Sequence, residues 1–208
     1  AGVTFVLDRA GVTGADGASH NGVWDIAMCS MIPGLRLAAP RDEETLRARL
    51  REALDVDDAP TVIRYRKGAL PEPMPALRSV GGVDILFDEA VDGSSARVLI
   101  VGTGACAPDA IEAACRLSAG GVSVTVADPQ WMIPVCPELA TLARDYDCVV
   151  SVEDGIVQGG FGWSLRDAVA EAGMPVRCLG VPQRFPEHVD RSEMIADRKS
   201  TRLNSSHI

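Results

Sequence analysis

The segment from Asp8 to Gly22, DRAGVTGADGASHNG, holds two acidic residues, one arginine, the first of the chain's three histidines and four glycines. The glycines allow tight turns and a close approach of the backbone to a ligand. The polar side chains that could converge on one small molecule are Arg9, Asp16, Ser19 and His20. An ordinary turn with a surface histidine is the alternative, because Asp-Gly and Asn-Gly pairs are frequent in turns.

A second basic cluster, RYRKG at 64–68, ends an apolar, strand-like stretch. On a strand, Arg64 and Arg66 would share one face and Lys67 would lie on the other. At most part of the cluster would therefore meet one phosphate group. The alternative is a charged strand end that faces solvent.

The composition narrows the class of protein. The 208 residues, 47% of them apolar, suffice for one large domain or two small ones. A net charge of −9 argues against nucleic acid or an anionic membrane as a partner. No apolar run approaches a membrane span and no leader pattern opens the chain, so we expect a cytoplasmic protein.

The cysteines predict buried, reduced thiols rather than disulfides or zinc ligands. They show neither a C-x-x-C pair nor a histidine at ligand spacing. Their positions are 29, 106, 115, 136, 148 and 178.

Strands and helices alternate in the first third of the chain. The pattern predicts strands at 3–7, 35–40 and 61–65 and helices at 24–32 and 42–54. Asp42 is expected to cap the second helix. Its apolar face would carry Leu46, Leu50 and Leu54.

A second alternating series follows a stretch rich in Pro and Gly at 69–96, which resembles a linker with one short strand, VDILF. Strands are expected at 97–102, 122–128, 148–154 and 175–181, with helices at 109–118, 138–145 and 163–172. Such alternation predicts an α/β fold made of two parallel-sheet units with helices on both faces. Because parallel sheets bind ligands beyond the carboxyl ends of their strands, the loop after strand 3–7 is the expected site.

The segment 8–22 resembles the signature loop of the 1-deoxy-D-xylulose-5-phosphate synthase family. The members of this family are thiamine-diphosphate enzymes of the transketolase superfamily. Further stretches agree with that family in consistent order, and the resemblance covers residues 1 to about 196. These stretches are PGLRLAAPRDEETLRARL, PTVIRYRKG, VTVADPQWMIPV and VVSVEDGIVQGGFG.

The resemblance implies a domain organisation. Residues 1–68 would be the carboxyl-terminal part of a pyrimidine-binding domain, 69–96 a linker, and 97–196 the carboxyl-terminal transketolase domain. The tail 197–208 resembles a translated sequencing adapter, so we expect it to be non-native and the chain to be a fragment. The second domain would mainly support a homodimer, and Glu153 and Asp154 would serve packing or an interface.

The resemblance also implies a reaction. Pyruvate and D-glyceraldehyde 3-phosphate would join with loss of carbon dioxide, and the product would feed isoprenoid, thiamine and pyridoxal synthesis. His20 would hydrogen-bond substrate oxygens and shuttle a proton, a task that suits an imidazole. Asp16 would accept a hydrogen bond from the acceptor's hydroxyl or orient the imidazole.

Phosphate binding would fall to Arg9, Arg64 and Lys67, by the same resemblance. A planar guanidinium grips phosphate better than a point charge. Lys67 stands where the family often has Arg, which would weaken the grip, and Arg66 stands where the family usually has Pro.

Thiamine diphosphate and Mg²⁺ are bound in this superfamily by an amino-terminal domain with a G-D-G-type motif, which nothing in this chain matches. The glutamate that activates the cofactor also lies upstream. We therefore expect no cofactor-binding or metal-binding residue in this chain, and no activity from it alone.

Two other readings stay open. An E1 beta subunit of a 2-oxoacid dehydrogenase, or the small subunit of a split transketolase, would share the second unit but match the loop 8–22 less well. A non-catalytic nucleotide-binding or flavin-binding module could use the VGTGA stretch after strand 97–102. That stretch is a weak fingerprint, because Ala107 replaces its third glycine.

Overall fold

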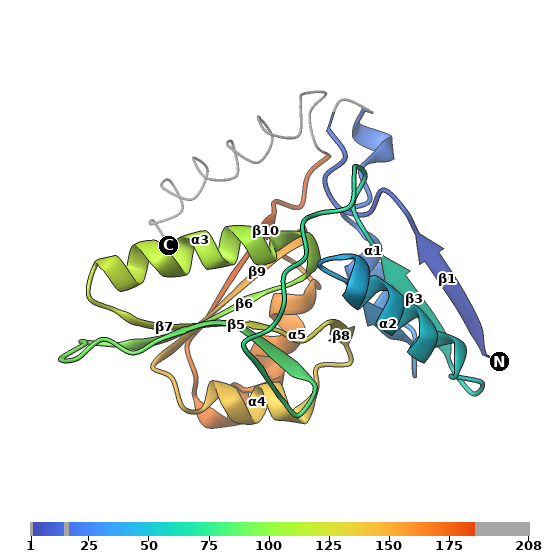
Figure 1. The fold of residues 1–208 in the computed structure, drawn as a ribbon. Helices are drawn as coiled ribbons and strands as arrows, with labels where there is room; N and C mark the ends of the chain where they lie inside the picture. Colours follow the sequence, from blue (N-terminus) through green and yellow to red (C-terminus); the bar gives the residue numbers. More distant parts are fainter. Residues whose placement is uncertain (1, 15–16, 186–208) are drawn as a thin grey trace.

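The computed structural model describes residues 2–14 and 17–185, which form two sheets with helices packed against them (Figure 1). The strand order is β1-β3-β2-β8 in the first sheet and β10-β9-β6-β7-β5-β4 in the second. The predicted α/β architecture is confirmed. Asp16 and the tail 197–208 lie outside the described residues.

The first sheet combines three parallel strands with one antiparallel strand from far along the chain. Its strands are β1 (Val3–Leu7), β2 (Arg36–Ala38), β3 (Pro60–Arg64) and β8 (Trp131–Ile133). Helix α1 spans Asp25–Cys29 and α2 spans Glu43–Leu54. Strand β8 pairs antiparallel with β2, and the sequence pattern did not reveal it because only three residues are involved.

The second sheet has a parallel centre and antiparallel strands at one edge. Its strands are β4 (Arg78–Val80), β5 (Val83–Glu89), β6 (Arg97–Gly102), β7 (Ser123–Asp128), β9 (Cys148–Ile156) and β10 (Val176–Val181). Strand β5 runs antiparallel to β7, and β4 antiparallel to β5. The stretch 69–96 therefore supplies the edge strand β4 and its neighbour β5 in addition to connecting the sheets.

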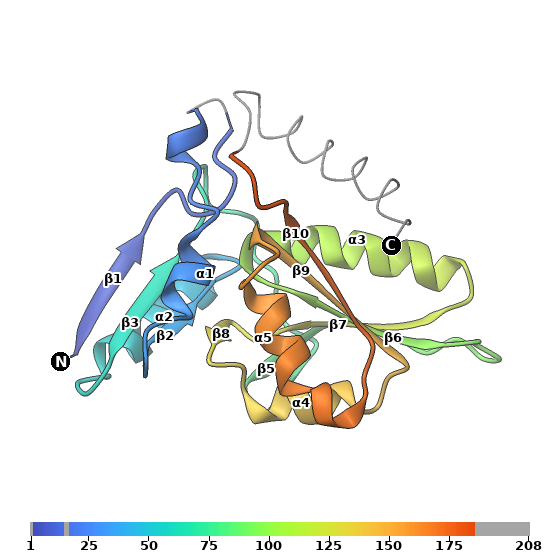
Figure 2. The same cartoon turned by 180° about the vertical axis from the view of Figure 1, so that it is seen from behind.

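Helices lie on both faces of the second sheet (Figures 1 and 2). Helix α3 (Ala107–Ala119) covers one face, and α4 (Pro137–Ala143) and α5 (Phe161–Ala168) cover the other. Single turns occur at η1 (Ala18–His20), η2 (Gly104–Cys106) and η3 (Ala170–Ala172).

Helix α2 begins at the predicted cap. The Asp42 carboxylate accepts a hydrogen bond from the Thr45 amide at 2.9 Å, and the Asp42 amide donates to the Thr45 hydroxyl. Leu46 and Leu50 pack against buried residues of the first sheet. Leu54 is 68% exposed, whereas its neighbour Ala53 is fully buried, so the apolar face of the last turn is formed by Ala53 and not by Leu54.

Both sheets share one apolar core. Leu37 and Val62 of the first sheet are buried in the same cluster as Leu99 and Val101 of the second. Met132 of β8 is fully buried there as well. All six cysteines are free thiols, as predicted, but only Cys106 is buried, so the burial expected for the other five is wrong. Among the described residues, no helix has the length and apolar character needed to cross a membrane.

Candidate active site

The loop between β1 and α1 rises from the carboxyl ends of β1 and β3 (Figure 1). The strand register sets Leu7 beside Arg64, and the Ala10 amide donates to the Tyr65 carbonyl at 2.9 Å. The two arms of the loop join where the Gly11 amide donates to the Gly22 carbonyl. The loop therefore lies at the sheet edge where a parallel sheet binds its ligands.

Arg9 lies at the start of this loop with an exposed side chain and a φ of 58°. A positive φ is uncommon for a residue with a Cβ and costs about 1 kcal/mol. The hydrogen bond from Ala10 to Tyr65 holds the segment alongside the turn that follows β3.

His20 ends the single turn η1 at the exposed tip of the loop. The Ser19 hydroxyl lies 3.3 Å from Nδ1 of the imidazole. The Thr13 hydroxyl donates to the His20 carbonyl at 3.3 Å, which ties the backbone of His20 to the opposite arm.

Asn21 closes the loop from inside and was missed by the sequence analysis. Its Oδ1 accepts the Thr13 amide at 2.8 Å, and its Nδ2 donates to the Gly17 carbonyl at 3.0 Å. The side chain is buried. A short amide next to the histidine of a glycine-rich loop was the signal that could have revealed it.

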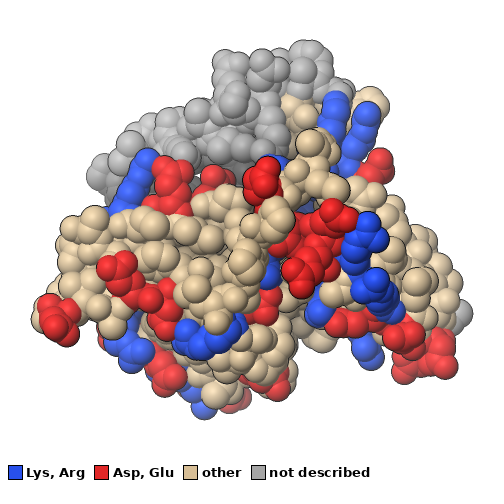
Figure 3. Space-filling view, viewed as in Figure 1, with Lys and Arg blue, Asp and Glu red and all other residues tan. Residues whose placement is uncertain are grey.

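Lys67 lies exposed in the turn after β3, so Arg9 and Lys67 come from neighbouring segments at one edge of the first sheet. Figure 3 shows Lys and Arg side chains at the top right of the molecule, over this edge. Arg9 and Lys67, two of the predicted phosphate ligands, are both exposed.

Arg64 has a different environment from the one expected for a phosphate ligand. It is only 2% exposed, and its guanidinium donates to Asp25 Oδ2 at 2.7 Å and to Asp154 Oδ1 at 2.6 Å. Burial lowers the pKa of this guanidinium, but the two carboxylates outweigh burial and raise it. Strand β9 contributes Asp154 to this buried pair, whereas the sequence analysis treated the RYRKG stretch as an isolated strand end.

Glu153 precedes Asp154 on β9 and is fully buried. Its carboxylate accepts the amides of Phe161 and Gly162 at 2.9 Å each, at the amino end of α5. Burial raises the pKa of Glu153 to about 7, although these amides favour its charged form. Glu153 therefore fixes α5 on β9, in line with the packing role expected for it.

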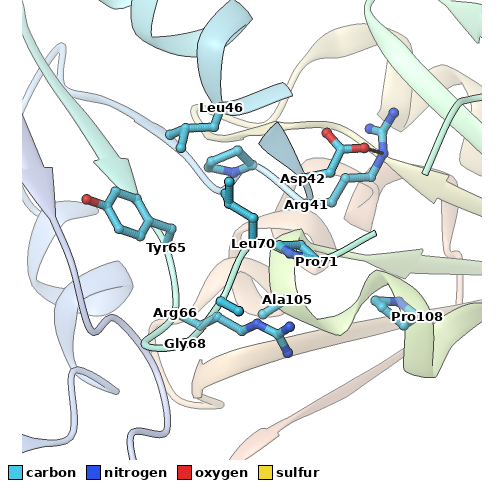
Figure 4. A pocket seen from close by; sticks show the side chains of 12 residues that line it. Arg41, Asp42, Leu46, Tyr65, Arg66, Gly68, Leu70, Pro71, Ala105 and Pro108 are labelled. Carbon is cyan, nitrogen blue, oxygen red and sulfur yellow. Dashed lines mark ion pairs between the residues drawn. The ribbon is translucent and has the colours of Figure 1, made fainter. Parts of the chain in front are cut away.

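Arg66 lines a separate cavity of about 300 Å³ between the two sheets (Figure 4). Leu46, Leu70 and Pro71 form part of its wall, and Ala105 lies near the start of α3. Arg66 therefore does not join Arg64 in the buried pair.

A metal site is absent from the part of the chain that the structure describes, where no three potential ligands cluster. The chemistry that these residues offer is anion binding by Arg9 and Lys67 and proton transfer by His20.

Two family models match the chain. "Transketolase, C-terminal domain" matches residues 90–203, and "Transketolase, pyrimidine binding domain" matches residues 1–73.

Curated relatives agree with these models. The chain is 49% identical over 199 residues to "1-deoxy-D-xylulose-5-phosphate synthase" of Corynebacterium glutamicum (strain R), covering 94% of this chain and 32% of that protein. It is 50% identical over 198 residues to "1-deoxy-D-xylulose-5-phosphate synthase 2" of Streptomyces avermitilis, covering 94% of this chain and 30% of that protein. The chain thus spans about a third of the length of these relatives.

A solved structure is also similar. It is titled "Split gene transketolase, inactive beta4 tetramer", with a TM-score of 0.71 and 26% identity. The match covers 95% of this chain and 65% of that one.

Proposed function

The chain belongs to the transketolase family, and on that premise we propose that it forms the acceptor side of the active site of a 1-deoxy-D-xylulose-5-phosphate synthase. This enzyme would join pyruvate and D-glyceraldehyde 3-phosphate and release carbon dioxide. The supporting observation is the loop between β1 and α1, which carries Arg9 and His20 at the carboxyl end of a parallel sheet and is bonded to Tyr65 at the start of the turn that holds Lys67.

In this proposal the basic residues bind the acceptor. Arg9 binds the phosphate of glyceraldehyde 3-phosphate through two parallel hydrogen bonds, and Lys67 adds a point charge. His20 hydrogen-bonds the substrate oxygens and moves a proton at the acceptor carbonyl. Asp16 would orient the acceptor's hydroxyl, and this residue lies outside the described residues.

The proposed cofactor is thiamine diphosphate with Mg²⁺, which supplies the electron sink for decarboxylation. The described residues do not fit the Mg²⁺-diphosphate part of that group, because no three metal ligands cluster among them. The role proposed for this chain is therefore limited to acceptor binding and proton transfer. By the same family resemblance we propose a cytoplasmic homodimer.

The direct test is an assay of the complete protein that carries this chain, supplied with thiamine diphosphate and Mg²⁺. Formation of 1-deoxy-D-xylulose 5-phosphate from the two substrates is expected, measured by mass spectrometry. Acyl transfer to a lipoyl group would identify an E1 beta subunit instead, and ketol transfer between sugar phosphates would identify a transketolase.

The phosphate role has its own test in Arg9→Ala. Loss of the guanidinium should raise the KM for glyceraldehyde 3-phosphate about tenfold or more, because a charge-assisted contact is removed. The KM for pyruvate should change less than twofold. Arg36→Ala is the matched control, since Arg36 is an exposed arginine at the amino end of β2. Equal effects of Arg9→Ala on both KM values would contradict the assignment.

A further inference from the structure

A buried ionic cluster lies at the base of the loop between β1 and α1. It joins Arg64 at the end of β3, Asp25 in the first turn of α1 and Asp154 on β9. Strand β3 belongs to the first sheet and β9 to the second, so the cluster connects the two sheets. The side chains of Arg64 and Asp154 are each only 2% exposed.

The loop backbone lies directly against this cluster. A Cβ at Gly11 would overlap the carboxylate of Asp154. Gly11 has a φ of 73°, and its amide donates to Gly22 across the loop. The other arm also meets β9, because the Ile156 amide donates to the Val23 carbonyl at 2.9 Å. Both arms of the loop therefore contact the same short stretch of β9.

An ionic cluster of this kind resists displacement. Removing charged groups from water is unfavourable unless each keeps a well-placed partner, so a shift of one group leaves another unpaired. Arg64 is held by carboxylates on two sides, and its guanidinium is planar and rigid. The position of Asp154 is therefore fixed more tightly than that of a surface carboxylate.

We propose that Asp154 is a positioning residue for the proposed reaction. Through its contact with Gly11 and its ion pair with Arg64, it fixes the position and orientation of the loop that carries Arg9 and His20. This inference rests on the proposed function. It assigns to the second sheet a part in the active site, where the sequence analysis expected packing or an interface.

Gly11→Ala in the complete protein is the main test, because it keeps every charge of the cluster. The added methyl group must push the loop away from Asp154. We expect kcat to fall at least tenfold and the KM for glyceraldehyde 3-phosphate to rise several-fold, with the KM for pyruvate within twofold. A simple loss of folded enzyme would lower kcat and leave both KM values unchanged.

Gly34→Ala is the matched control. Gly34 has a similar φ of 77°, but a Cβ there meets nothing within 4 Å. It carries the same backbone strain without the overlap, so its kinetic constants should stay within twofold of the wild type. Wild-type constants in Gly11→Ala, or an equal loss in both variants, would overturn the proposal.

Hydrogen exchange separates this inference from the proposed function, because it needs no activity. Gly11→Ala and Asp154→Asn should each speed the exchange of amides in residues 10–14 and 17–23 at least tenfold, while α2 keeps its wild-type rates. If exchange becomes faster only in the loop, but the complete protein makes no 1-deoxy-D-xylulose 5-phosphate, the proposed function is refuted. The role of Asp154 in positioning the loop is then still supported. Unchanged exchange in residues 10–14 and 17–23, or faster exchange spread equally over both sheets, would refute the positioning role.

Discussion

At the scale of single residues, the candidate site separates into exposed groups that can meet a substrate and buried groups that hold them. His20 is exposed at the loop tip, whereas Asn21, its neighbour, is buried and bonded to both arms. Arg64 and Lys67 differ in the same way, although both belong to one basic cluster. Residue type alone did not distinguish the two classes.

His20→Ala should lower turnover of the complete protein about 100-fold or more, because the variant removes a general acid–base group. Its thermal midpoint should stay close to that of the wild type, since the imidazole is exposed. Steady-state kinetics and a melting curve measure the two quantities. Turnover near the wild-type value would remove His20 from the mechanism.

At the scale of elements, the sequence predicted a feature correctly where the contacts that form it lie between residues close together in the chain. The cap of α2 is such a case, since Asp42 and Thr45 bond to one another within one turn. Asp42 also accepts the Met74 amide at 2.9 Å, which fastens the 69–96 stretch to the helix. One side chain therefore stabilises both the helix and the crossing between the sheets.

Asp42→Ala should lower the free energy of unfolding by about 2 kcal/mol, because the variant removes a helix cap and leaves the Met74 amide without this acceptor. Asp55→Ala is the matched control, as Asp55 is exposed at the other end of α2. Urea unfolding measures both variants. A loss no larger than that of the control would contradict this account of the cap.

At the scale of the whole molecule, buried ions join the two sheets at two places. Besides the Arg64 cluster, Arg41 contacts Asp84 at 2.8 Å and Asp128 at 3.0 Å. Burial raises the pKa of Asp128 to about 6, although Arg41 favours its charged form. The sheets are therefore held by a shared apolar core and by ionic contacts that respond to pH.

Stability should fall as pH rises from 5.5 to 8. The pKa of Glu153 is near its ordinary value of 4.5 in the unfolded chain and about 7 in the folded protein, so the folded state binds more protons in between. Glu153 should contribute a loss of about 2 kcal/mol, at about 1.4 kcal/mol for each pH unit between 5.5 and 7, and Asp128 adds to the loss near pH 6. Urea unfolding at both pH values measures it, and Glu153→Gln should reduce the slope.

The pKa of Asp42 is shifted in the opposite direction, and this shift does not affect stability between pH 5.5 and 8. Burial raises its pKa, but hydrogen bonds from Thr45 and Met74 lower it below 3.8 overall. Its contribution is lost only as pH falls through that lowered value. Equal or greater stability at pH 8 than at pH 5.5 would contradict the assignment of raised pKa values.

The sequence by itself determined the features that depend on near neighbours. Alternating apolar runs predicted β6 with its observed bounds and most of the other strands, and the rule for parallel sheets located the loop with Arg9 and His20. The sequence pattern did not predict the strand β8 or the edge strand β4, because each has only three residues and three residues give too little periodicity.

Only the tertiary structure decided what Arg64 does. Its partners lie 39 and 90 residues away in the chain, and periodicity carries no information about such distances. Burial by β9 turned an expected phosphate ligand into the centre of an ion pair, because a charge without access to water must find its counter-charges within the protein.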